Sequence, residues 1–280
     1  MVIPQRSRYR PLMSEPQGRV LAIGGSDSGG GAGIQADIKT ITALGGYAAS
    51  AVTAVTVQDT LGVHAIHAVP PNLVAAQIRS VLADIGADAI KTGMLGEADV
   101  GWAIVEALAE HAAIPLVVDP VLAASSGAEL TRPAAHEPLR RLIARAELVT
   151  PNAFEAAALT ARKVETTNDL RTAGEALLAM GAKAALMKGG HIEGERVIDL
   201  LITRAGETVF EGPRIATRHT HGTGCTLASA CAAGLAQGLS LEMAVSRAWA
   251  FTGEAVRQAP GFGAGQGPLG HAAAAPTKDR

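Results

Sequence analysis

Short apolar segments with strand-forming residues alternate with helical segments from residue 19 onward, and this rhythm limits the fold more than any other feature of the chain. Such an alternation is typical of parallel strands joined by helical crossovers. We therefore predict an α/β fold with a mostly parallel central sheet. The predicted strands are residues 20–23, 50–57, 89–92, 116–119, 148–150 and 184–188.

Helices and one hairpin complete the pattern. The clearest helix is residues 70–85, because its apolar residues fall on one face at helical spacing. Residues 196–203 and 207–211, separated by a short turn, predict an antiparallel hairpin at the sheet edge. Two late helices are expected at 226–237 and 241–258.

The chain contains no internal repeat and no segment with the composition of a domain linker, so a single domain is the economical interpretation. A length of 280 residues is enough for a large buried core. We place this domain at residues 19–272. Residues 1–18 are expected to be a disordered leader; a transit peptide is the alternative, although this segment has no amphipathic helical repeat. Residues 273–280 are expected to be a flexible tail.

Charge and cysteine content exclude several function classes. The 24 basic and 26 acidic residues nearly cancel, and no basic block interleaves with aromatic residues, so we expect no nucleic-acid partner. No apolar run reaches the length of a membrane span, so we expect no membrane association. Cys225 and Cys231 lie in one predicted helix and cannot form a disulfide framework, which favours the reducing cytoplasm.

Polar residues and glycines follow each predicted strand. In open parallel sheets, ligands bind beyond the carboxyl ends of the strands, so these residues are expected to build a site. They are residues 24–33, Gln58 and Asp59, Gly93 and Met94, Asp119, Asn152 and Glu155, and residues 189–191, with residues 219–225 after the hairpin.

The glycine cluster at residues 24–33 matches neither common nucleotide-binding pattern. The spacing of a dinucleotide fingerprint is absent, and no lysine follows as a Walker A loop requires. Because the cluster carries Asp27 and precedes Asp37, we expect these residues to line a polar small-molecule pocket. The alternative is a tight strand-to-helix turn in which Asp27 and Ser28 are helix caps.

The segment His221-Gly-Thr-Gly-Cys225 places two glycines directly before an alanine-rich helix. Unpaired N–H groups and the partial positive charge of a helix N-terminus stabilise an anion there, so we predict a phosphoryl-transfer site at Gly222 and Gly224. Cys225 lies in the first helical turn, where the same field is expected to favour the thiolate, which makes it a candidate general base. The alternative is a small buried core residue.

Two further strand ends offer charged groups. Lys188 ends an apolar strand and is followed by two glycines, which favours a phosphate contact; a lysine that extends along the surface into solvent is the alternative. Glu155 follows Asn152 after a strand, and these two residues alone indicate only a well-capped helix start.

In this order, the motifs resemble the ribokinase-like superfamily and, within it, the hydroxymethylpyrimidine/phosphomethylpyrimidine kinases of thiamine biosynthesis. The resemblance covers about residues 20–271 and implies a three-layer α/β/α fold with a mostly parallel central sheet and an antiparallel edge hairpin. Its carriers are GSDSGGGAGIQADIKT (25–40), TAVTVQ (53–58), KTGML (91–95), VDPV (118–121), TPNAFE (150–155), MKGGH (187–191) and THGTGCT (220–226).

For the site, the resemblance implies three groups of residues. The pyrimidine pocket would be formed by Gly25, Asp37, Gln58 and Met94, with Gln58 hydrogen-bonded to the aminopyrimidine. ATP would contact Lys188, Asn152 and Thr223, beside the catalytic Gly222, Gly224 and Cys225. Mg²⁺ would be held by Asp119 and Glu155, directly or through water. Cys225 stands where most of the superfamily carries an aspartate base.

The implied activity is transfer of the ATP γ-phosphoryl group to 4-amino-5-hydroxymethyl-2-methylpyrimidine and then to its monophosphate. Phosphorylation of pyridoxal or pyridoxine at the same site is the alternative, and Gln58 favours the pyrimidine because relatives specialised for the pyridine ring tend to lack it. A pyrimidine-binding protein without catalysis is a second alternative, although such a protein need not keep Lys188 and the glycine-cysteine turn. By analogy with relatives, we expect a homodimer.

Overall fold

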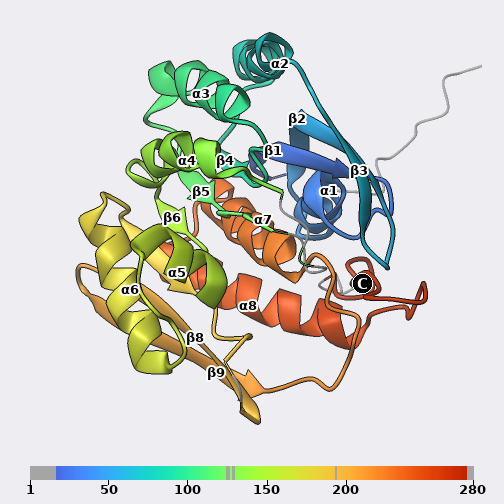
Figure 1. Ribbon diagram of the computed structural model, residues 1–280, viewed down its shortest axis with the longest axis vertical. Helices are drawn as coiled ribbons and strands as arrows, with labels where there is room; N and C mark the ends of the chain where they lie inside the picture. The colour runs from blue at the N-terminus through green and yellow to red at the C-terminus, as the bar shows by residue number, and fades with distance from the viewer. Residues whose placement is uncertain (1–16, 124–126, 128–129, 193, 276–280) are drawn as a thin grey trace, which may run out of the picture.

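A computed structural model of the protein describes residues 17–123, 127, 130–192 and 194–275. Among these residues, nine strands form one sheet in the order β3-β2-β1-β4-β5-β6-β7-β8-β9 (Figure 1). The strands are β1 (Arg19–Asp27), β2 (Tyr47–Gln58), β3 (Val63–Ala68), β4 (Ala89–Thr92), β5 (Leu116–Val118), β6 (Leu148–Val149), β7 (Ala184–Met187), β8 (Arg196–Thr203) and β9 (Gly206–Pro213).

The central strands, from β2 through β1, β4, β5 and β6 to β7, are parallel. β8 and β9 form the antiparallel hairpin that the sequence predicts at the edge of the sheet. β3 is an unpredicted antiparallel strand at the opposite edge. Its residues are exposed or only partly buried, so it has no alternation of apolar and polar residues to reveal it.

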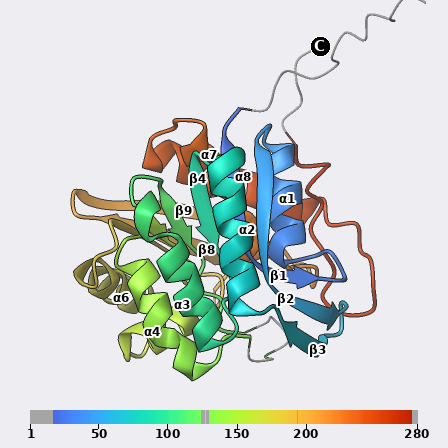
Figure 2. The ribbon, with the colours of Figure 1, turned by 90° about the horizontal axis from the view of Figure 1, so that it is seen from above.

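Helices cover both faces of the sheet. They are α1 (Gly33–Ala43), α2 (Pro71–Asp84), α3 (Ala98–Ala107), α4 (His136–Ile143), α5 (Ala153–Thr160), α6 (Thr167–Ala179), α7 (Thr223–Ala236) and α8 (Leu241–Arg257). One apolar core lies under α2 to α6, and a second lies under α1, α7 and α8 (Figure 2). The predicted three-layer α/β/α architecture is therefore confirmed.

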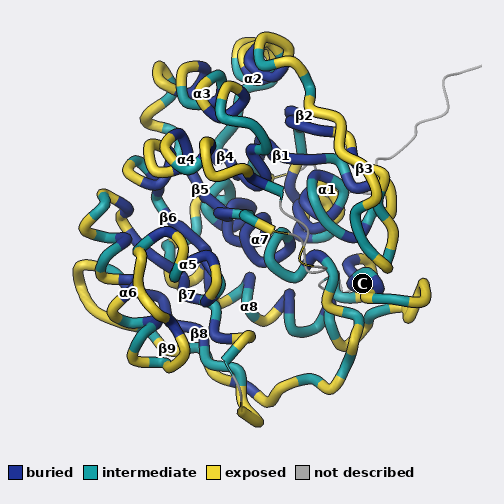
Figure 3. The backbone as a smooth tube through the Cα atoms, in the orientation of Figure 1, coloured by how far each residue is buried: buried dark blue, intermediate teal, exposed yellow. Residues whose placement is uncertain are grey.

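Successive residues of a central strand point to opposite faces of the sheet, so they contribute alternately to the two cores. In β5, Leu116 and Val118 enter the core under α2 to α6, whereas Val117 enters the other. Strands buried on both faces read as continuous apolar runs, which is how the sequence identified them. The backbone coloured by burial shows the sheet and α7 buried at the centre, with the outer helices exposed on their far sides (Figure 3).

Two segments differ from their expected limits. α7 begins at Thr223 rather than at residue 226, because Gly222, with φ of 88°, is its N-cap. Of the expected leader at 1–18, only Gln17 and Gly18 are described, and residues 276–280 of the expected tail also lie outside the described residues. No helix in the described ranges combines the length and the apolar character needed to cross a membrane.

Candidate active site

The carboxyl ends of the parallel strands open into one pocket of about 1040 Å³. All the residues that the sequence assigns to substrate, ATP, metal or catalysis line this pocket. They are Gly25, Asp37, Gln58, Met94, Asp119, Asn152, Glu155, Lys188, Gly222, Thr223, Gly224 and Cys225. The structure thus brings together residues that lie up to 200 positions apart in the chain, while their individual roles stay predictions.

The N-terminus of α7 forms one end of the pocket. A Cβ atom on Gly222 would overlap the carbonyl oxygen of Gly31, and one on Gly224 would lie 3.1 Å from the Nζ atom of Lys188. Glycine is therefore needed at Gly222, where it lets the turn pack against the loop after β1, and at Gly224 it leaves the Lys188 ammonium room that a side chain would narrow. The first N–H groups of α7 have no acceptor within the helix and can bind an anion.

Lys188 follows β7 and adds a positive charge to this end. Its Nζ atom lies 3.3 Å from Oδ1 of Asp119 and 3.8 Å from Oε2 of Glu155, and its side chain is only 13% exposed. Although burial lowers the pKa of Lys188, the two carboxylates raise it above its usual value. The side chain is therefore a fixed cation inside the pocket, not a lysine that extends into bulk solvent.

Asn152 and Glu155 begin α5 with a reciprocal capping box, as their positions predict. The N–H of Glu155 donates to Oδ1 of Asn152 at 2.9 Å, and the N–H of Asn152 donates to Oε2 of Glu155 at 2.7 Å. Burial raises the pKa of Glu155 to about 7, and the nearby Asp119 carboxylate acts in the same direction, while Lys188 opposes both.

The donor set at Asp119 and Glu155 fits a magnesium ion that is shared with a phosphate. Within the described ranges, no group of three His, Cys, Asp or Glu side chains is placed to hold a metal. Mg²⁺ bound with nucleotides commonly takes only one or two carboxylates and completes its shell with phosphate oxygens and water. Burial is the main cause of the raised pKa of Glu155, and a divalent cation beside Glu155 and Asp119 would stabilise their charged forms.

The expectation that Cys225 is a thiolate is wrong for the protein without ligands. Burial raises the pKa of the Cys225 thiol to about 12, and Asp37 and Asp119 add to this effect. The ammonium of Lys91 lowers the pKa but does not compensate. A helix N-terminus favours an anion only by a limited amount, and the loss of solvent outweighs it here.

The opposite end of the pocket, called the slot below, is lined by Gly25, Gln58 and Met94. A Cβ atom on Gly25 would lie 2.8 Å from Sδ of Met94, so the thioether packs directly against the Gly25 backbone. Met94 is buried, and its carbonyl oxygen accepts from Oγ1 of Thr53 at 2.8 Å.

Asp37 lies beneath the pocket, and its carboxylate is already fully engaged. Nζ of Lys91 donates to its two oxygens at 2.9 and 3.0 Å, and Oγ of Ser229 donates to Oδ1 at 2.6 Å. Although burial lowers the pKa of Lys91, the Asp37 carboxylate raises it above its usual value, so the ammonium stays charged. Asp37 therefore ties α1 to β4 and α7 below the slot.

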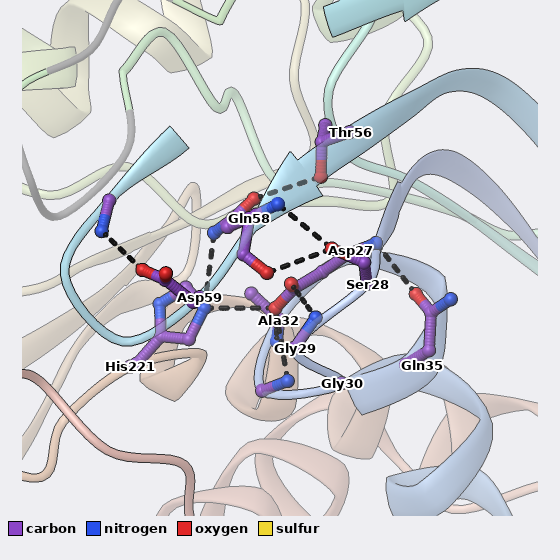
Figure 4. A network of polar contacts seen from close by, with 12 residues as sticks. Asp27, Ser28, Gly29, Gly30, Ala32, Gln35, Thr56, Gln58, Asp59 and His221 are labelled. Carbon is purple, nitrogen blue, oxygen red and sulfur yellow. Dashed lines mark hydrogen bonds and ion pairs between the residues drawn. The ribbon is translucent and has the colours of Figure 1, made fainter. Parts of the chain in front are cut away.

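Asp27 organises the loop after β1 (Figure 4). Its carboxylate accepts the N–H groups of Gly29, Gly31 and Ala32 at 2.8 to 3.0 Å, and Oδ2 lies 2.9 Å from Nε2 of His221. Although burial raises the pKa of Asp27, its hydrogen bonds to His221 and the backbone lower it below the usual value. The alternative that Asp27 and Ser28 are helix caps is wrong, because the N-cap of α1 is Ala32 and no side chain caps it. The Asp27 carboxylate instead holds its own loop and the turn before α7, and it lines the pocket as expected.

Sequence reasoning missed three charged or polar groups around the pocket. Lys91 lies in a buried strand, and His221 was assigned no role of its own. Asp199 accepts from the N–H of Gly189 at 2.8 Å and from Nε1 of Trp249 at 3.1 Å. A usable signal existed for Lys91 and Asp199, because a charged residue inside an apolar strand needs a buried partner.

Comparisons with known proteins find relatives that match most of the chain. A family model described as phosphomethylpyrimidine kinase matches residues 27–270. The hydroxymethylpyrimidine/phosphomethylpyrimidine kinase of Salmonella typhimurium is 46% identical over 255 residues, which cover 90% of this chain and 96% of that protein. The thiamine biosynthesis bifunctional protein ThiED of Geobacter sulfurreducens is 47% identical over 93% of this chain, and the match spans about half, 53%, of that longer protein.

The solved structures include a relative with a different named substrate. An ADP complex of Bacillus subtilis pyridoxal kinase matches with a TM-score of 0.86 at 32% identity, covering 92% of this chain and 98% of that one. The fold and the arrangement of the strand ends are therefore shared with a kinase named for a pyridine substrate.

Proposed function

The chain belongs to the phosphomethylpyrimidine kinase family, and from this premise we propose that it transfers the γ-phosphoryl group of ATP to 4-amino-5-hydroxymethyl-2-methylpyrimidine and then to the resulting monophosphate. The observation that carries the proposal is the single pocket that joins a slot for a flat ring, at Gly25, Gln58 and Met94, to an anion site at Gly222, Gly224 and Lys188. A hydroxymethyl group on a ring in the slot would face the phosphate end.

Catalysis would rest on position and electrostatics. As the hydroxyl oxygen bonds to the γ-phosphorus and ADP departs, negative charge builds on the phosphoryl oxygens. Lys188 and the N–H groups at the start of α7 are fixed in the pocket and would stabilise that charge without having to move. Asn152 and Thr223 line the same end and would contact the nucleotide.

Mg²⁺ would be held at Asp119 and Glu155, where its charge would stabilise the ATP phosphates. These two carboxylates approach one another around Lys188. The two carboxylates would also hold the Lys188 ammonium beside the phosphates at the N-terminus of α7.

Cys225 would take the proton that the substrate hydroxyl loses. Because the thiol of the free protein is protonated, Cys225 would first have to release its own proton to solvent, and only the resulting thiolate could accept the proton of the substrate; Lys91 lowers the pKa of Cys225 in the required direction. Phosphoryl transfer through a loose transition state needs little help from a base, so the thiol is an addition to the electrostatic contribution.

The test is identification of the product. With ATP and Mg²⁺, the purified protein should convert the pyrimidine into a monophosphate and then a diphosphate, detected by mass spectrometry, with matching release of ADP. Absence of pyrimidine-dependent ADP release, with both the pyrimidine and its monophosphate, would overturn the proposal.

Pyridoxal phosphorylation is the second candidate, and the similarity to the Bacillus subtilis pyridoxal kinase favours it. A pyridine ring and a pyrimidine ring have the same size, so the shape of the slot would not separate them. The amide of Gln58 distinguishes the two rings, since it can bond at once to a ring nitrogen and to the amino group beside it, an arrangement that pyridoxal lacks.

We also propose that the protein is a homodimer that uses the β2–β3 edge. On one face of β2, Val55 is 50% exposed and Val57 58%, with His67 and Ala65 of β3 opposite them, and exposed apolar residues beside a sheet edge favour a partner. Val57→Asp should convert the dimer to a monomer in sedimentation velocity, and a monomeric wild-type protein would contradict the proposal.

Two further assignments accompany this function. We propose residues 19–272 as one catalytic domain, which the continuous sheet and the family match over residues 27–270 support. We propose the cytoplasm as the compartment, which the two free thiols, Cys225 and Cys231, support because a reducing environment preserves them.

A further inference from the structure

The side chain of Gln58 is placed between two polar groups that fix it from both flanks (Figure 4). One end of its amide lies 3.2 Å from Nε2 of His221, and the other lies 3.2 Å from Oγ1 of Thr56. Its backbone is held separately, because its N–H donates to Oγ of Ser28 and its carbonyl oxygen accepts from the same hydroxyl, both at 2.8 Å. The remaining question is which of the two amide atoms of Gln58, Nε2 or Oε1, faces His221.

The contact with Asp27 determines which ring nitrogen of His221 carries a hydrogen. Asp27 is buried, accepts three backbone N–H groups, and has its pKa below the usual value, so it is an anion that can only accept. Nε2 of His221 lies 2.9 Å from Oδ2 of Asp27, and therefore Nε2 must carry a hydrogen whether or not Nδ1 does.

A histidine nitrogen that carries a hydrogen cannot accept a hydrogen bond from another donor. The structure places Nε2 of Gln58 toward His221 and Oε1 toward Thr56, so two N–H groups oppose each other at 3.2 Å. A half-turn of the amide exchanges its nitrogen and oxygen with almost no change in shape. Oε1 then accepts from Nε2 of His221, which shares its hydrogen between Gln58 and Asp27.

The other end of the amide favours the same direction. Oγ1 of Thr56 lies 3.0 Å from the carbonyl oxygen of Ser26, which can only accept, so the single hydroxyl hydrogen is used there. Thr56 then has lone pairs but no hydrogen to offer to Gln58 at 3.2 Å. An amide N–H on this side donates to Thr56, whereas an amide oxygen would face the lone pairs of another oxygen.

The rigidity of this arrangement comes from the glycines around it. A Cβ atom on Gly31 would overlap the imidazole of His221, and one on Gly222 would overlap the backbone of Gly31. The imidazole therefore packs directly against the loop that Asp27 organises, and it has little freedom to turn away from Gln58.

We propose that His221, held by Asp27, is a positioning residue that fixes the direction of the Gln58 amide and thereby decides which way round the aminopyrimidine binds. This inference rests on the proposed function, because it concerns that substrate. Oε1 on the His221 side keeps one lone pair for the amino group of the ring, and the nitrogen on the Thr56 side keeps one N–H for the adjacent ring nitrogen.

The substrate chemistry makes this direction consequential. The amino group lies between the ring nitrogen and the carbon that carries the hydroxymethyl group. An amino group at the His221 end therefore places the hydroxymethyl group on the side of the chain that continues into Gly222 and Cys225. With the reverse amide direction, the ring would turn over and carry the reacting hydroxyl to the Thr56 side.

A double-mutant cycle with steady-state kinetics on the full-length enzyme tests the proposal. His221→Phe keeps a ring but loses the donor, and Gln58→Met keeps the length but loses the amide. His221→Phe should lower kcat/KM for the pyrimidine by about tenfold in the wild-type background and by less than about twofold in the Gln58→Met background. Thr56→Val, which loses the acceptor at the other flank, should lower it by about two- to threefold.

An equal loss in both backgrounds would overturn the proposal, since it would show that His221 supports the turn before α7 and not Gln58. A second measurement does not depend on activity or on the folding of variants. The ¹H–¹⁵N spectrum of the ligand-free wild-type protein near pH 7.5 should show Nε2 of His221 protonated, and an unprotonated Nε2 would equally overturn it. If no pyrimidine is phosphorylated, the proposed function fails while the histidine spectrum still decides this contact.

Discussion

Nζ of Lys188 lies 3.3 Å from Oδ1 of Asp119, which joins the end of β7 to the end of β5 across the intervening β6. The pair is at the mouth of α7, where Gly224 leaves room for the ammonium. One fixed cation is thus aimed at the position where the transferred phosphoryl group would develop charge, and most of the expected catalytic effect depends on it.

Removing the charge of Lys188 should therefore slow the chemical step. We expect Lys188→Met to lower kcat by about 10²- to 10³-fold, the scale on which a preorganised electrostatic group acts. The control is Lys183→Met, because Lys183 is 70% exposed and pairs with Glu147 outside the pocket. Steady-state assays in which both variants lose activity equally would contradict the role of Lys188.

Replacement of Cys225 by alanine should lower kcat far more than it changes KM for the pyrimidine. If the Cys225 thiolate accepts the hydroxyl proton, Cys225→Ala should lower kcat by about 10²-fold or more while KM changes little. Cys231→Ala is the matched control, because Cys231 is a buried thiol in the same helix that does not line the pocket. An unchanged kcat in Cys225→Ala would remove the residue from the base assignment.

Ionisation of Glu155 should lower the free energy of unfolding as the pH rises. Its pKa is raised from 4.5 to about 7 in the folded protein, so the folded state binds more protons between these values. The contribution is present below about pH 4.5 and is lost as the pH rises through 7. Urea unfolding should show Glu155→Gln gaining on the order of 2 kcal/mol over the wild type between pH 5 and pH 8.

The control for this prediction is Asp169→Asn. Asp169 occupies the equivalent capping-box position in α6 but is exposed, and its pKa is lowered, so its stabilising effect is lost as the pH falls. The two variants should therefore differ from the wild type with opposite pH trends. A pH-independent difference for Glu155→Gln would show that its pKa is not raised.

Lys91 and Asp37 should be strongly coupled. Both are fully buried, and removing one partner leaves the other charge without compensation, so Lys91→Met should cost about 3–5 kcal/mol of unfolding free energy. Lys91→Met combined with Asp37→Asn should cost clearly less than the sum of the single changes, because the second removes the stranded charge. Additive losses in urea unfolding would contradict the ion pair.

The sequence predicted the central sheet well, because strands buried on both faces are recognisable as apolar runs. It did not predict β3, since Val63 to Ala68 are held by backbone hydrogen bonds to β2 and not by burial of side chains. Hydrogen bonding between backbones leaves no pattern in residue type.

The site residues could be collected from the sequence because each of them follows a strand, and the carboxyl ends of parallel strands meet at one edge. Their electrostatic state could not be obtained in this way. The thiol of Cys225 depends on its burial by other segments, and the carboxylate of Asp37 depends on Lys91, which lies 54 positions further along the chain. Position along the chain does not determine such partners.

The most direct test of the central claim is one assay that compares three substrates under identical ATP and Mg²⁺. ADP release should be supported by the hydroxymethylpyrimidine and by its monophosphate, each with a kcat/KM at least about tenfold above that for pyridoxal, the difference expected from the contacts of Gln58 with the aminopyrimidine edge. A higher kcat/KM for pyridoxal than for either pyrimidine would contradict the account.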